Sequence, residues 1–238
     1  SNNTSVGYQS LNANTTGTFN VAVGSGALTN TTTSNGNTAI GYQTLNGTSG
    51  NNNTAVGRQA LENNTANDNA AFGNIALRDN TSGSNNAAFG DRSLLSNTTG
   101  DNNTAVGRAA LQQNTTGNNN TANGYDALTE NTTGTKNVAV GVQALEQNTT
   151  AANNCALGYR ALKENTTGSK NVAFGANALD ANTTANSNTA VGYAALGATD
   201  TGANNTAVGE SALSALTSAT SNVAVGHHAL KTNTTGNT

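Results

Sequence analysis

The sequence contains no Met, no Pro and no Trp, and it has a single Cys. One Cys excludes an intrachain disulfide, and the absence of Met means that the chain has no initiator residue. We therefore expect an internal segment or a processed product, a fragment of a longer fibre protein. Few oxidisable side chains and no Pro also fit a chemically durable, exposed polymer.

Charge and aromatic residues are scarce as well. Charged residues make up 9% of the chain, against about 25% in an ordinary globular protein. Nine Lys and Arg are spread over 238 residues, so there is no basic patch and we expect no nucleic-acid binding. No apolar run approaches the roughly 18 residues of a membrane span, so we expect no membrane insertion. The composition resembles a disordered tract, but the apolar residues stand at fixed phase, which argues for folded structure.

What the chain has is one short pattern repeated from end to end. Its reference residue is a Gly that recurs every 17 residues, with two steps of 16. The copies are Gly7, Gly24, Gly41, Gly57, Gly73, Gly90, Gly107, Gly124, Gly141, Gly158, Gly175, Gly192, Gly209 and Gly226. Such a period indicates a repeat architecture, so residues 1–238 are interpreted as a single continuous array of fourteen coils.

Certain columns of the repeat are nearly constant. Four residues before each Gly stands an Asn, and these Asn are predicted to form a hydrogen-bonded ladder between stacked coils. The ladder comprises Asn53, Asn69, Asn86, Asn103, Asn120, Asn137, Asn154, Asn171, Asn188 and Asn205, with equivalents in the other copies. A Val-class residue precedes the Gly, except at Asn123, and a Leu follows it by four.

Charged residues avoid the block from the Asn to the Gly, and they avoid the Leu column and the position before it. Because charged side chains are almost never buried without a partner, these protected columns are predicted to be the core. The predicted core includes Val106, Leu111, Val140, Leu145, Phe174 and Leu179.

Within N-T-A-V-G, β-branched residues alternate with Ala and Gly, which is strand patterning. The face made by Ala105, Gly107, Ala139 and Gly141 is unusually small, so another backbone is expected to pack closely against it. The second half of the repeat, as in residues 114–117 and 131–134 (N-T-T-G), predicts turns with Asn capping and Gly at positive φ. The short Ala-Leu stretch leaves a second strand and a helical turn both open.

A 17-residue coil is too short for a helical hairpin and matches one coil of a β-solenoid. The predicted fold is all-β: a parallel β-solenoid, or β-roll, of fourteen coils that rise about 4.8 Å each. Each coil offers little apolar burial against the entropy of ordering 17 residues. We therefore expect a parallel homotrimer that buries the Ala/Gly face.

The pattern N-T-A-V-G-Y-x-A-L followed by N-T-T-G resembles the repeat stalks of bacterial and phage tail-fibre-like proteins, which often precede a self-cleaving chaperone domain. It is also similar to the head repeats of trimeric autotransporter adhesins, in which N-x-V-A-x-G builds a left-handed parallel β-roll from a usually shorter repeat. The resemblance covers all fourteen copies and implies a trimeric, extracellular, fibrous protein used for attachment, on a virion tail or a bacterial cell surface.

Few residues suggest a specific site. Tyr42, Tyr125, Tyr159 and Tyr193 (and Tyr8) directly follow the Gly, and an exposed Tyr column could stack on the sugar rings of a receptor glycan. The alternative is an aromatic that merely covers the coil edge. His227 and His228 are interpreted as surface residues, because adjacent strand residues point to opposite faces. Cys155 is interpreted as a small buried hydrophobe.

The Thr and Asn residues suggest two further hypotheses. The regular Thr columns suggest the hypothesis of ice binding, although a turn explains them better. The N-T-T triplets match the sequence motif for N-glycosylation. No phosphate loop, paired carboxylate or triad is present, so we expect no enzyme activity, no cofactor and no metal. The expected function is a structural extracellular fibre shaft that positions an adhesive tip. The alternatives are a glycan-binding adhesin surface and a self-assembling filament subunit, with self, a host glycan or a protein receptor as partner.

Overall fold

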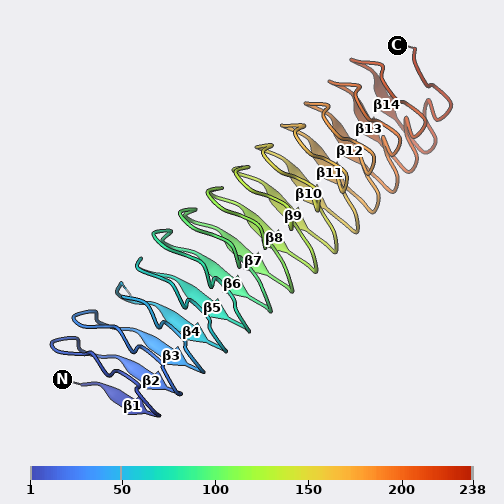
Figure 1. The fold of residues 1–238 in the computed structure, drawn as a ribbon. Coiled ribbons are helices and arrows are strands. Elements are labelled where there is room, and N and C mark those ends of the chain that lie inside the picture. Colours follow the sequence, from blue (N-terminus) through green and yellow to red (C-terminus); the bar gives the residue numbers. More distant parts are fainter. Residues whose placement is uncertain (1, 49, 237–238) are drawn as a thin grey trace. The chain divides into compact units, whose positions relative to one another are not determined.

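The structure is a computed structural model that describes residues 2–48 and 50–236. The chain divides into two compact units, Ser1–Asn119 and Asn120–Thr238. In each unit the chain winds into successive coils, and each coil contributes one three-residue strand (Figure 1). All regular elements of the described residues are strands, which confirms the predicted all-β parallel solenoid.

In the first unit the strands lie side by side in sequence order, and the strands are parallel. They are β1 (Thr4–Val6), β2 (Val21–Val23), β3 (Thr38–Ile40), β4 (Thr54–Val56), β5 (Ala70–Phe72), β6 (Ala87–Phe89) and β7 (Thr104–Val106).

The second unit repeats this arrangement, again with parallel neighbours in sequence order. Its strands are β8 (Thr121–Asn123), β9 (Val138–Val140), β10 (Cys155–Leu157), β11 (Val172–Phe174), β12 (Thr189–Val191), β13 (Thr206–Val208) and β14 (Val223–Val225).

Strand register follows the columns of the sequence. Where the repeat shortens to 16 residues, Thr38 still pairs with Thr54, and Thr54 pairs with Ala70. A one-residue slip would turn every side chain to the opposite face. The missing residues are therefore absorbed outside the strands, in the second half of the coil, as the pattern predicted.

The strands turn their small residues inward. Ala105 and Ala139, the central residues of β7 and β9, are both 0% exposed within a single chain. The Ala face therefore lies inside the coil, and the expectation that a second chain buries it is wrong.

The core prediction is correct for the Leu column and wrong for the Val column. Leu111, Leu145 and Leu179 are each 0% exposed. By contrast Val106 is 38% and Phe174 40% exposed, and Val140 is only partly buried. Side chains alternate across a strand, so residues on either side of an inward Ala must point outward.

The close backbone approach was correctly placed at the Gly column, but the neighbour is the next coil of the same chain. A Cβ on Gly141 (φ +136°) would lie 2.6 Å from the carbonyl carbon of Gly158. Gly107 takes the same left-handed backbone, with φ 128°. A side chain in this column would strain the backbone and separate the coils.

The turns differ from the prediction. The Ala-Leu stretch is neither strand nor helix. Its Leu has a left-handed backbone, as at Leu111 with a φ of 52°. The Leu N–H bonds to the next coil, as where the N–H of Leu94 donates to the carbonyl of Ala110 at 3.0 Å. The Gly of N-T-T-G does not take a left-handed φ. At Gly134 a Cβ would instead collide with the Asn131 Oδ1 atom and the Ala151 carbonyl oxygen.

The predicted Asn ladder is confirmed. In the first unit, the backbone N–H of Asn103 donates to Oδ1 of Asn86 (2.9 Å), which lies one coil earlier. The same bond recurs at 2.9–3.0 Å for Asn53, Asn69, Asn86, Asn137, Asn154, Asn171, Asn188 and Asn205. Asn120 accepts the bond from Asn137. These side chains are at most 1% exposed.

A second ladder was not predicted. In the coils named below, the Asn that opens the second-half turn is buried, and its Nδ2 donates to Oδ1 of the equivalent Asn one coil earlier. In the first unit this series is Asn64, Asn80, Asn97 and Asn114, at 2.6–2.7 Å. In the second it is Asn131, Asn148, Asn165 and Asn182, at 2.7–3.0 Å. The turn Asn therefore belongs to the core.

Candidate functional site

The outward side of the strands is the most extensive candidate surface. We call it the strand-face stripe: in each unit, the first and third residues of every strand. Its third-residue column includes Phe89 (40% exposed) and Val106 (38%) in the first unit. In the second unit it includes Leu157 (49%) and Phe174 (40%). The rings of Phe72 and Phe89 stack on each other, with centroids 4.9 Å apart.

None of the charged residues of the chain occurs at either outward position of any strand. Charges occur freely in the neighbouring column just after the Gly, as at Arg58, Asp91 and Glu210. A surface that is free of charge in both units, with an apolar third-residue column interrupted only at Asn123, is typical of a protein–protein contact. Sequence reasoning found the protected column but assigned it to the core.

The Tyr column is exposed in both units. In the second unit Tyr125, Tyr159 and Tyr193 are 45%, 51% and 56% exposed, and in the first unit Tyr42 is 51% exposed. The three Tyr of the second unit recur every second coil, since Val142 and Ala176 occupy the column between them. The prediction that this column binds a glycan remains a prediction.

A cluster of charged side chains covers part of the second unit. Arg160 Nη2 lies 3.5 Å from Asp180 Oδ2, and Lys163 Nζ lies 2.6 Å from Glu164 Oε1 and 3.8 Å from Glu146 Oε2. Burial raises the pKa of Asp180 and Glu146 above their ordinary values, although Arg160 and Lys163 respectively oppose the shift.

Beside this cluster lies a surface hollow of about 410 Å³, bordered by Arg160, Asp180, Gly197 and Ser214. Arg160 Nε and Asp180 Oδ1 form no hydrogen bond. The hollow exists because small residues stand in this part of the coils. The Arg160–Asp180 ion pair lines one side of the hollow. Such ion pairs are common on protein surfaces, and we assign no chemistry to the hollow.

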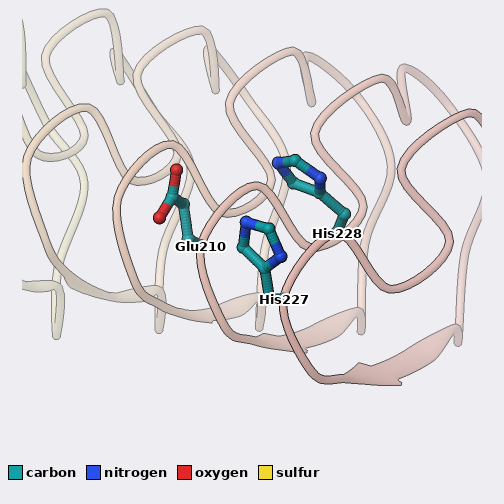
Figure 2. Close-up of side chains that lie close together, drawn as sticks. All are labelled: Glu210, His227 and His228. Carbon is teal, nitrogen blue, oxygen red and sulfur yellow. The ribbon is translucent and has the colours of Figure 1, made fainter.

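The two His residues lie together with a carboxylate. Figure 2 shows the side chains of Glu210, His227 and His228 close together on successive coils. Their ligand atoms all lie within 4.8 Å of one another, and all three residues are exposed. The imidazole rings stack with centroids 3.8 Å apart. The prediction that these adjacent side chains point to opposite faces is wrong, because the pair lies in a turn after β14 and His228 has a φ of 57°.

Cys155 opens β10 and points outward, partly buried. Burial raises the pKa of its thiol, so that its reactive thiolate form is disfavoured. It lies in the strand-face stripe rather than in the interior, which corrects the predicted burial.

Together, the coils, the two Asn ladders and the parallel strands define the class: this is a parallel β-solenoid repeat protein. Comparison with protein-family models, curated proteins and solved structures gives no match to this chain. Among the described residues, no helix has the length and apolar character needed to cross a membrane.

Proposed function

We propose that this chain is a structural extracellular fibre shaft, built from identical coils and holding an adhesive tip away from a virion tail or cell surface. The observation that carries the proposal is the strand-face stripe. A solenoid that worked alone in water would be expected to place charge on its exposed strand side chains, and this one never does.

The occupant of the stripe is a second and third copy of the same chain. Each strand presents the same outward pair of positions, so parallel copies can align coil against coil with like columns facing one another. Thr and Val dominate the first outward column, and Val, Ile, Leu and Phe dominate the second. In a closed homotrimer this mixture becomes an apolar interior of the kind found in homo-oligomer interfaces.

The shaft needs stiffness rather than chemistry. Every coil is bonded to its neighbour within the unit through the first Asn ladder, the strand bonds and the Leu bonds. The second Asn ladder adds to these bonds between residues 64 and 114 and between residues 131 and 182. Contacts in such arrays run between nearest neighbours, so the number of coils sets the length.

Negative-stain microscopy of the purified chain tests the proposal. The expected result is discrete rods of uniform length. Unbounded filaments would overturn the shaft in favour of the filament subunit, in which coils continue from chain to chain. Small particles without an elongated form would contradict both.

A second candidate is glycan binding by the Tyr column, because Tyr125, Tyr159 and Tyr193 are about half exposed and lie on one column of the second unit. Aromatic faces are suited to apolar sugar faces. A glycan array probed with the wild type and with a triple Tyr→Ala variant at these positions tests this function. Equal binding by both proteins would exclude the Tyr column.

A further inference from the structure

We propose that Glu210, His227 and His228 form a binding site for a divalent transition-metal ion, with Zn²⁺ as the expected ligand. The site clips the coil that contains β14 to the coil that contains β13. It is independent of the proposed shaft function, because Glu210 and His227 lie on the Tyr column and His228 directly follows it, all outside the strand-face stripe.

The backbone places the three residues. Gly209 and Gly226 occupy the same column of successive coils, so Glu210 and His227 follow them at equivalent positions, one coil apart. The strands before them pair in register, Val208 with Val225. The N–H of His228 donates to the carbonyl oxygen of Glu210 at 2.9 Å, which ties the two turns together.

The three ligand groups lie near enough to converge on one ion after side-chain rotation. A tetrahedral Zn²⁺ with bonds of about 2.1 Å separates its ligand atoms by roughly 3.4 Å. Ligand atoms of Glu210, His227 and His228 lie within 4.8 Å of one another before any ion is placed. All three residues are exposed, so rotation about side-chain bonds can close this gap without moving the coil.

The donor set selects the metal. Two imidazole nitrogens and one carboxylate oxygen suit Zn²⁺, Cu²⁺ and Ni²⁺, whereas Mg²⁺ and Ca²⁺ prefer oxygen ligands alone. Three protein ligands leave the fourth tetrahedral position to water.

The clip has a structural consequence. An ion shared by Glu210 and the two His would hold the coil that contains β14 to the coil that contains β13.

Isothermal titration of the full chain with ZnCl₂ tests the site. We expect one Zn²⁺ per chain, with Mg²⁺ giving no heat of binding under the same conditions. His227→Ala, His228→Ala and Glu210→Gln should each weaken Zn²⁺ binding by at least about tenfold, since even outer-shell partners of a metal contribute that much. Tyr193→Ala, in the same column one coil earlier, is the matched control and should bind as the wild type does.

A spectroscopic readout identifies the ligands directly. The chain contains only two His residues, so long-range ¹H–¹⁵N spectra of the imidazoles report on this site alone. Addition of Zn²⁺ is expected to shift both rings and to slow amide exchange in residues 223–230. Unshifted imidazole signals, or undiminished Zn²⁺ affinity in His227→Ala, would overturn the proposal.

The repeat also permits reconstruction of the site elsewhere. In the first unit Tyr42 and Arg58 occupy the same column on successive coils, and the N–H of Gln59 donates to the carbonyl of Tyr42 at 2.9 Å. This bond matches that of His228 and Glu210. The triple variant Tyr42→Glu, Arg58→His and Gln59→His, made on the His227→Ala background, is expected to restore one Zn²⁺ per chain. Failure to restore binding in a folded variant would show that coil geometry does not assemble the site.

Discussion

Asn103 and Asn114 donate to the same atom: the carbonyl oxygen of Gly117 accepts Nδ2 of Asn103 at 2.8 Å and Nδ2 of Asn114 at 3.0 Å. The two Asn ladders are therefore joined once in the coil, through one backbone carbonyl. Both side chains are 0% exposed, so neither amide can turn to water instead. The polar interior of the coil is one connected network.

This network predicts that a single turn Asn is essential to local stability. Asn114→Ala removes the bonds to Asn97 and Gly117 and leaves the buried Oδ1 of Asn97 without its donor, whereas the Gly117 carbonyl keeps the bond from Asn103. We expect the free energy of unfolding to fall by about 1–3 kcal/mol. Gln113→Ala, at an exposed neighbouring position, should change it by less than about 0.5 kcal/mol. Urea denaturation followed by circular dichroism compares the two; equal effects would refute the role of the ladder.

The end of the second ladder predicts a stabilising change. Asn182 Oδ1 is buried without a hydrogen-bond partner, because Thr199 stands one coil later where the next Asn would donate. Thr199→Asn supplies that donor and is expected to raise the free energy of unfolding by about 1 kcal/mol. The hydroxyl of Thr199 now donates to the Leu216 carbonyl (3.1 Å), so the new amide must also serve that acceptor. A urea midpoint at or below that of the wild type would contradict this account of the ladder's end.

Left-handed backbone predicts a second stabilising change. Lys170 is exposed and has a φ of 62°, whereas in the first unit the equivalent position is occupied by Gly36 with a φ of 70°. A non-Gly residue in this region costs about 1–2 kcal/mol, and Gly costs about 0.4–1 kcal/mol in the unfolded chain. Lys170→Gly should therefore raise the thermal midpoint slightly. Thr167→Gly, at an exposed position without positive φ, should lower it, and the opposite order would refute the strain.

Burial of Asp180 predicts a pH dependence. Its pKa is raised above the ordinary value of 3.8, chiefly by desolvation, so the folded chain keeps this proton to higher pH than the unfolded chain does. The free energy of unfolding must then fall as pH rises from that value through the raised pKa. Asp180→Asn is expected to reduce this fall. Urea midpoints at about pH 4 and about pH 7 give the comparison, and an unchanged difference between them would contradict it.

Much of the fold follows from the sequence because every coil of a solenoid repeats the same local structure. The period set the coil, and the invariant Asn column predicted a ladder whose partners are one period away, as Asn86 and Asn103 are. The Leu column, as at Leu111, was correctly placed inside. These features depend only on phase and residue type, which the sequence contains.

The sequence did not distinguish side chains that point into the coil from side chains that point to its outer surface. A buried column and an outward column that is covered by another chain both lack charge, so Val106 was placed in the core although it points outward. Asn114 was assigned to a capped turn because Asn suits both turns and ladders. The Glu210–His227–His228 cluster depends on a left-handed turn at His228, which residue types alone do not predict.

We propose that copies associate through the strand-face stripe, and multi-angle light scattering measures this association. The wild type is expected to have about three times the 23.7 kDa mass of one chain. Phe174→Glu with Leu157→Glu places charge on the stripe and should give the mass of a single folded chain. Tyr159→Glu with Tyr193→Glu, on the adjacent Tyr column, should leave the mass of the assembly unchanged. A wild type that stays at the mass of one chain, or a Phe174→Glu/Leu157→Glu variant that keeps the wild-type mass, would contradict the claim.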